Sequence, residues 1–118
     1  MLKFICYPKC TTCQKAKKWL DENEFSYELR DIKTENPTFD ELSGWYKISG
    51  QPLKKFFNTS GLLYKSMELK NKLPDMSEEE MLRLLSSDGM LVKRPLLISE
   101  SFVLIGFKAE TWEQKLLK

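Results

Sequence analysis

Two cysteines separated by two residues are the part of this sequence whose spacing could carry chemistry. Cys10 and Cys13 follow a short apolar run that ends at Tyr7, and they open a stretch whose apolar residues have helical spacing. Thiols spaced in this way can form a disulfide or bind a metal. A zinc site needs four ligands, and the chain has one further cysteine, Cys6, and no histidine. The pair therefore favours redox chemistry over zinc binding.

The helical spacing predicts different roles for the two thiols. Residues i and i+3 of a helix lie roughly 5 to 6 Å apart, which suits the Cα separation of a disulfide. Cys10 is predicted at the N-terminal edge of the helix, where free N–H groups and the nearby Lys9 and Lys15 stabilise a thiolate. We predict that Cys10 is the nucleophile and that the more buried Cys13 resolves a mixed disulfide formed on it. Cys6, within the apolar run, is interpreted as a core residue.

Composition limits the other functions. The chain has 118 residues, 42% of them hydrophobic, which is enough for one domain spanning residues 1–118. Its net charge of +2 gives no broad basic surface, so direct nucleic-acid binding is not expected. The N-terminal apolar run is too short for a signal peptide, and no stretch is long enough to span a membrane. We expect a cytoplasmic monomer, in which a close cysteine pair is more often redox-active than structural.

The elements that must position the pair follow from the periodicity of apolar residues. Strands are predicted at residues 2–7, 25–32, 96–99 and 102–105. A helix between the first two strands makes them parallel, whereas the last two form an antiparallel hairpin. A final helix at residues 109–117 covers the sheet.

The segment between the second and third predicted strands has a helical character. Residues 37–47 form a helical stretch, and Ser77 with Glu80 forms a capping box that begins another helix. We therefore expect a core of about residues 1–34 and 93–118 and an all-helical insert of about residues 35–92.

Arg94 and Pro95 stand at the entrance to the third predicted strand. A proline there can hold a cis peptide bond, although most bonds before proline are trans. Arg94 could offer a planar cationic group to a thiolate or an oxyanion. From these residues alone, a surface arginine before a strand is the simpler interpretation.

Two motifs together resemble a known family. Residues 7–13, Tyr-Pro-Lys-Cys-Thr-Thr-Cys, and residues 91–98, Leu-Val-Lys-Arg-Pro-Leu-Leu-Ile, flank the helical insert. Over essentially its whole length the chain resembles the arsenate reductase (ArsC) family of thioredoxin-like proteins, including its Spx/MgsR-related branch. The resemblance implies an α/β fold, with a glutaredoxin-like core of a four-stranded mixed sheet and a helical insert between the second and third strands. It also implies a cis bond before Pro95, a catalytic Cys10 beside that loop, and an anion- or thiolate-binding Arg94.

Departures from the arsenate reductases decide which activity we expect. The glutathione- and glutaredoxin-linked enzymes use two further arginines for the oxyanion, and these positions fall on Lys54 and near Gly106, where Lys108 is close. They also typically lack a cysteine at the position of Cys13. We therefore expect a thiol–disulfide oxidoreductase that forms an intramolecular disulfide, with arsenate reduction as a further alternative. Lys9 and Lys54 are candidate anion-binding residues.

The resemblance also leaves a regulator as an alternative to an enzyme. Members of the Spx type carry the Cys-x-x-Cys pair and use its oxidation state to control binding to RNA polymerase. For an enzyme, the electron donor would be glutathione, glutaredoxin or thioredoxin, and the sequence does not choose among them. No bound cofactor or metal is expected, because the chain has no glycine-rich phosphate loop and no coherent ligand cluster.

Overall fold

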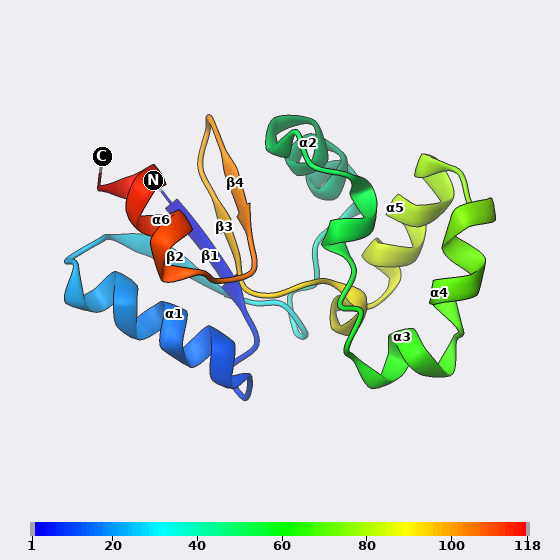
Figure 1. Cartoon of the computed structure of the whole chain (residues 1–118), viewed down its shortest axis with the longest axis horizontal. Coiled ribbons are helices and arrows are strands. Elements are labelled where there is room, and N and C mark those ends of the chain that lie inside the picture. Colours follow the sequence, from blue (N-terminus) through cyan, green and yellow to red (C-terminus); the bar gives the residue numbers. More distant parts are fainter. Residues whose placement is uncertain (1, 118) are drawn as a thin grey trace.

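A mixed four-stranded sheet stands between two groups of helices in the computed structural model, which describes residues 2–117 (Figure 1). The strands lie in the order β2 (Tyr27–Asp31), β1 (Leu2–Cys6), β3 (Leu96–Ile98) and β4 (Val103–Ile105). β1 pairs in parallel with β2 and antiparallel with β3, which in turn forms an antiparallel hairpin with β4. The predicted α/β class, the parallel pair and the hairpin are confirmed.

The two faces of the sheet build two separate cores. Successive side chains of a strand point to opposite faces. Phe4 and Cys6 of β1 therefore pack in the core on the side of α1 (Thr11–Glu22) and α6 (Ala109–Leu116), whereas Ile5 packs in the core that includes the insert. Figure 1 shows α1 and α6 on one side of the sheet and the other helices on the opposite side. Cys6 thus faces the helix that carries the cysteine pair.

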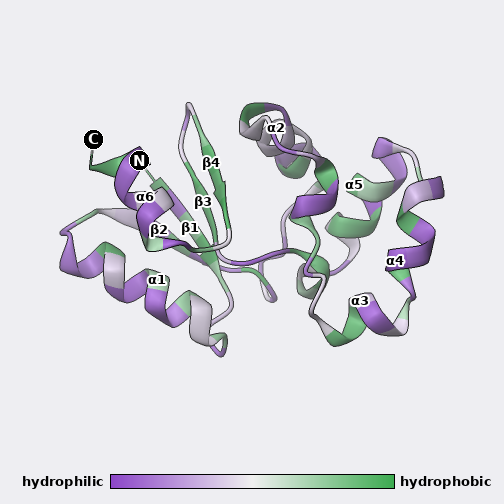
Figure 2. Cartoon of the chain, viewed as in Figure 1, coloured by the Kyte–Doolittle hydropathy of each residue, from purple (hydrophilic) through white to green (hydrophobic). Residues whose placement is uncertain are grey.

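The insert between β2 and β3 is helical, as predicted. It contains α2 (Phe39–Ser49), α3 (Leu62–Ser66), α4 (Leu69–Lys72) and α5 (Glu78–Ser87). Short 3₁₀ turns occur at Leu53–Phe56, Leu73–Asp75 and Gly89–Leu91. Figure 2 shows hydrophobic and hydrophilic residues alternating along these helices, as expected for elements with one buried face. No helix within residues 2–117 has the length and hydropathy needed to cross a bilayer.

Capping boxes set the beginnings of two insert helices. At α5, Ser77 Oγ accepts from the Glu80 N–H and the Glu80 carboxylate accepts from the Ser77 N–H, as predicted. Thr38 and Glu41 form the same pair of bonds at α2, which the sequence analysis did not identify. Each capping box thus satisfies the backbone N–H groups of the N-cap residue and of the third helical residue.

An ion pair links β2 to the first helix of the insert. Arg30 Nη1 donates to Glu41 Oε2 at 2.6 Å, and Arg30 Nη2 donates to Glu41 Oε1 at 2.8 Å. The guanidinium stabilises the carboxylate and lowers the pKa of Glu41 from 4.5 to about 2. Both side chains are partly buried, so the pair is screened less than a surface contact.

Glu41→Gln is expected to lower the free energy of unfolding at pH 7 by about 2 kcal/mol, because Arg30 loses its charged partner. Since the folded-state pKa of Glu41 lies below its unfolded value, the contribution is complete above pH of about 4.5 and is lost as the pH falls towards 2. Urea denaturation at pH 7, 4 and 2.5 measures this difference. Glu79→Gln is the control, because its pair with Arg83 is exposed and is expected to contribute at most about 0.5 kcal/mol. A Glu41→Gln effect that stays constant with pH would contradict the assignment.

Candidate active site

Cys10 occupies the turn between β1 and α1. Its N–H donates to the Tyr7 carbonyl at 2.9 Å, and the Gln14 side chain donates to the Pro8 carbonyl at 3.0 Å, so the turn is held at both ends. Cys10 is the N-cap residue of α1, and its side chain makes no capping hydrogen bond. The first turn of α1 contains no acidic residue. Cys10 therefore lies at the positive end of the helix dipole, in the position that the sequence predicted.

Cys10 lines a pocket with a volume of about 450 Å³. The opposite walls come from the insert around Asn58, from the segment that enters β3, and from the turn after β4. Three cations, Lys93, Arg94 and Lys108, share this pocket with Cys10, and none of the described residues that line it is acidic. The pocket is therefore electropositive and suits a thiolate, a carboxylate or an oxyanion.

Arg94 is fixed beside Cys10 by contacts with two segments. Its guanidinium carbon lies 5.3 Å from the centre of the Tyr7 ring, and Nη1 donates to the Met90 carbonyl at 3.4 Å. The Arg94–Pro95 peptide bond is cis, and this loop lies next to Cys10, as the family resemblance implies. The Tyr7 ring and the Met90 carbonyl therefore hold the guanidinium, and Arg94 lines the same pocket as Cys10.

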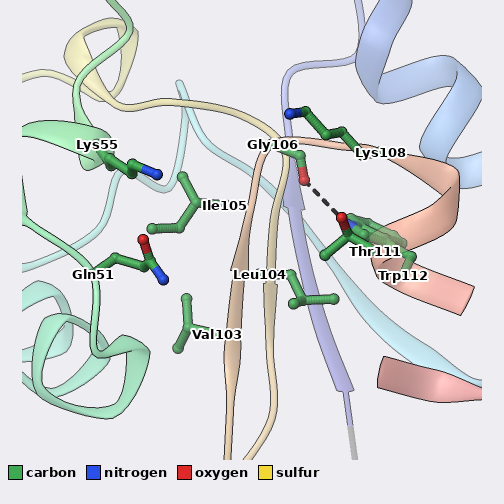
Figure 3. A pocket seen from close by; sticks show the side chains of 9 residues that line it. All are labelled: Gln51, Lys55, Val103, Leu104, Ile105, Gly106, Lys108, Thr111 and Trp112. Atoms are coloured by element: carbon green, nitrogen blue, oxygen red, sulfur yellow. Dashed lines mark hydrogen bonds between the residues drawn. The ribbon is translucent and has the colours of Figure 1, made fainter. Parts of the chain in front are cut away.

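The turn after β4 places Lys108 at the pocket. Gly106 adopts a φ of 77°, and its N–H donates to the Pro95 carbonyl at 2.8 Å. The buried Trp112 donates from Nε1 to the Gly106 carbonyl at 3.1 Å. Figure 3 shows this bond in a neighbouring pocket, which Lys108 also lines. These two bonds tie the turn to Pro95 on one side and to α6 on the other.

Asn58 is a pocket residue that the sequence analysis did not identify. Its side chain is only 7% exposed, and its Oδ1 accepts from Ser60 Oγ at 3.3 Å. Among the described residues, none accepts a hydrogen bond from its amide nitrogen. A β-carbon at position 61 would lie 2.6 Å from this nitrogen, so Gly61 leaves the room that the amide occupies. Asn58 thus offers a donor to whatever enters the pocket.

The two other candidate anion-binding lysines lie elsewhere. Lys9 is exposed and does not line the Cys10 pocket. Lys54 is also exposed and lines a neighbouring pocket, which shares Lys93 with the Cys10 pocket. The structure therefore brings Lys93 and Lys108 to Cys10 instead of these two residues.

The three cysteines are free thiols with very different access to solvent. Cys10 is partly exposed, whereas Cys13 and Cys6 are 2% and 5% exposed. Cys13 Sγ accepts from the Tyr7 N–H at 3.3 Å. Hydrogen bonding with Cys6, together with burial, raises the pKa of Cys13, and the contact with Cys13 lowers the pKa of Cys6 against the opposing effect of burial. Within residues 2–117, no three His, Cys, Asp or Glu side chains are grouped as metal ligands.

Comparison with known proteins identifies the family of this chain. The sequence profile of the ArsC family matches residues 6–115. YusI of Bacillus subtilis, an uncharacterized protein, is 50% identical over 113 residues, which cover 96% of each chain. The regulatory protein MgsR of the same species is 29% identical over 106 residues, covering 90% of this chain and 82% of MgsR. An ArsC family related protein from Bacteroides fragilis superposes with a TM-score of 0.94 and is 57% identical, covering 96% of this chain and 95% of that one. The chain therefore belongs to the ArsC family, as the motifs around Cys10 and Arg94 predicted.

Proposed function

We propose that this protein is a cytoplasmic thiol–disulfide oxidoreductase that works through an intramolecular disulfide between Cys10 and Cys13. The position of Cys10 supports this proposal most directly. It is the sulfur of the pair that reaches the pocket, and it does so beside three cations and a helix N-terminus. Its partner Cys13 is buried one turn further along the same helix.

The reaction proceeds in two exchange steps. The Cys10 thiolate attacks one sulfur of a substrate disulfide, forms a mixed disulfide and displaces the first thiolate, whose charge Arg94 stabilises. Cys13 then loses its proton and attacks the Cys10 sulfur, which releases the second thiol and leaves the Cys10–Cys13 disulfide. Glutathione, glutaredoxin or thioredoxin supplies two electrons to restore both thiols.

A coupled assay tests this activity and identifies the donor. Reduction of bis(2-hydroxyethyl) disulfide is followed by NADPH consumption, with glutathione and its reductase, with glutaredoxin added, or with thioredoxin and its reductase. We expect the protein to accelerate NADPH consumption with at least one donor. Rates equal to the protein-free background with all three donors would overturn the proposal.

Arg94→Ala is expected to lower kcat/KM for disulfide reduction roughly 10- to 100-fold, because the displaced thiolate loses a fixed cation. Arg94→Lys keeps the charge but loses the planar group stacked on Tyr7, so an intermediate rate is expected. Arg83→Ala is the matched control, since this arginine lies on α5 and is exposed. Equal kcat/KM values for Arg94→Ala and the unmodified protein would remove Arg94 from the proposed mechanism.

A redox-sensing regulator that binds RNA polymerase is the second candidate. The observation in its favour is the likeness to the regulatory protein MgsR over most of both chains. The test is a pull-down of purified RNA polymerase by the immobilised protein, once with the thiols reduced and once with the Cys10–Cys13 disulfide formed. Retention in only one redox state would support a regulator, and no retention in either state would exclude this function.

Arsenate reduction is the third candidate, and the electropositive pocket favours it. Arg94 is the one arginine among the described residues that line the pocket, and Lys93 and Lys108 supply the remaining positive charge. Arsenate-dependent NADPH oxidation in the glutathione and glutaredoxin system measures this activity. A rate no faster than that of the Cys10→Ser variant would dispose of it.

A further inference from the structure

A third thiol lies beneath the cysteine pair. Cys6 is the last residue of β1, and its side chain lies on the face of the sheet that α1 covers. Cys6 and Cys13 belong to one buried cluster, and Cys10 packs against its edge. Cys13 therefore lies between an outer thiol in the pocket and an inner thiol on the sheet.

A backbone contact shows how near Cys13 comes to Cys6. Cys13 Sγ lies 3.3 Å from the backbone nitrogen of Tyr7, which is bonded to the carbonyl carbon of Cys6. Covalent geometry then places the Cys13 sulfur within about 6 Å of the Cys6 Cα. In the reduced protein, contact between the two thiols lowers the pKa of Cys6 and raises the pKa of Cys13.

We propose that Cys6 is a third redox-active residue, which replaces Cys10 as the disulfide partner of Cys13. The oxidised protein then contains a buried Cys6–Cys13 disulfide and a free Cys10. This step rests on the proposed oxidoreductase function. The Cys6 sulfur attacks Cys13, the Cys10–Cys13 bond breaks, and the Cys6–Cys13 bond forms. Cys10 leaves as a thiolate and takes up a proton in place of the one that Cys6 lost. No electrons enter or leave, because one protein disulfide replaces another.

Contact and access both support this role. In the reduced protein the contact with the Cys13 thiol lowers the pKa of Cys6 against the opposing effect of burial, which shows that the two side chains meet. Cys6 is only 5% exposed, so a bulky substrate disulfide cannot reach it, whereas the neighbouring Cys13 sulfur can. The exchange returns a free Cys10 to the pocket while the protein remains oxidised.

The sequence makes the two disulfides easy to distinguish. Trypsin cleaves after Lys3, Lys9 and Lys15, which places Cys6 in one peptide, residues 4–9, and both Cys10 and Cys13 in another, residues 10–15. A Cys10–Cys13 disulfide stays within one peptide, whereas a Cys6–Cys13 disulfide joins two. Protein oxidised with one equivalent of diamide is treated with N-ethylmaleimide, unfolded, digested and analysed by mass spectrometry. We expect the joined peptides with N-ethylmaleimide on Cys10; finding only the internal disulfide would overturn the proposal.

Labelling of the folded protein provides the matched control. Oxidised protein should still react with iodoacetamide at Cys10, and oxidised Cys6→Ala should lose this labelling, because its Cys10 stays in the disulfide. Reduced Cys6→Ala should be labelled at the unmodified rate, which shows that the pocket is intact. Equal labelling of the two oxidised proteins would overturn the role of Cys6. If the protein still reduces disulfides in that case, the proposed oxidoreductase function stands and only the redox role of Cys6 is excluded.

Discussion

Cys10→Ser is expected to lower kcat/KM for disulfide reduction by at least about 10³-fold, because the variant lacks the only sulfur of the pair that lines the pocket. A serine hydroxyl is not ionised near neutral pH and does not attack a disulfide. Cys13 cannot replace Cys10, because it is 2% exposed and its pKa is raised by hydrogen bonding with Cys6 and by burial. The coupled NADPH assay measures the loss.

Cys13→Ser is the informative partner of this variant. It keeps the nucleophile and lacks the resolving thiol, so the mixed disulfide on Cys10 should accumulate after one turnover without external thiol. Intact-protein mass spectrometry would detect the added half of bis(2-hydroxyethyl) disulfide. The serine hydroxyl can still accept from the Tyr7 N–H, so the turn before α1 should be retained. Full turnover in Cys10→Ser, or the absence of an adduct in Cys13→Ser, would contradict the assigned roles.

Gly89→Ala is expected to have the largest effect on stability, lowering the free energy of unfolding by more than about 3 kcal/mol. Gly89 is buried at the end of the insert, and a β-carbon there would lie 1.8 Å from the Ile32 carbonyl oxygen. That oxygen belongs to the backbone, and the Ile32 N–H is bonded to the Cys6 carbonyl at 2.8 Å, so the segment after β2 cannot easily move away. The midpoint of thermal unfolding should fall by more than about 10 °C.

Gly44→Ala is the matched control for this clash. A β-carbon at position 44 meets no atom within 4 Å, and the residue lies inside α2. Alanine is a better helix former than glycine, so this variant should be more stable by about 0.5 to 1 kcal/mol. Equal stability of the two alanine variants would contradict the expected clash between a β-carbon at position 89 and the Ile32 carbonyl oxygen.

Local patterns predicted most of the secondary structure. Short apolar runs identified β1 and the strands of the final hairpin, alternation of apolar and polar residues identified β2, helical spacing identified α1, and Ser77 with Glu80 identified the start of α5. The predicted second strand was too long, because Phe25 stacks on Trp19 at 5.9 Å instead of joining β2. Helices α3 and α4 were not resolved individually, because 5 and 4 residues are too few to establish a helical period.

Some residues of the candidate site could be identified from local sequence, and others only from the tertiary structure. The sequence by itself determined the cysteine pair at a helix start and the Arg94–Pro95 element, because both are short motifs that depend on neighbouring residues. Only the tertiary structure decided that Asn58, Lys93 and Lys108 surround Cys10, while Lys9 and Lys54 do not. Which residues line the pocket depends on how segments far apart in the chain pack against each other. The local periodicity of the sequence does not predict that packing.

Cys6 shows this difference most clearly. Its apolar surroundings predicted a buried residue, and it is buried. Its contact with Cys13 follows from the direction of its side chain on β1 and from the docking of α1 on that face of the sheet. The sequence therefore determined which residues can do redox chemistry, and the packing of a helix on a sheet decided which of them meet.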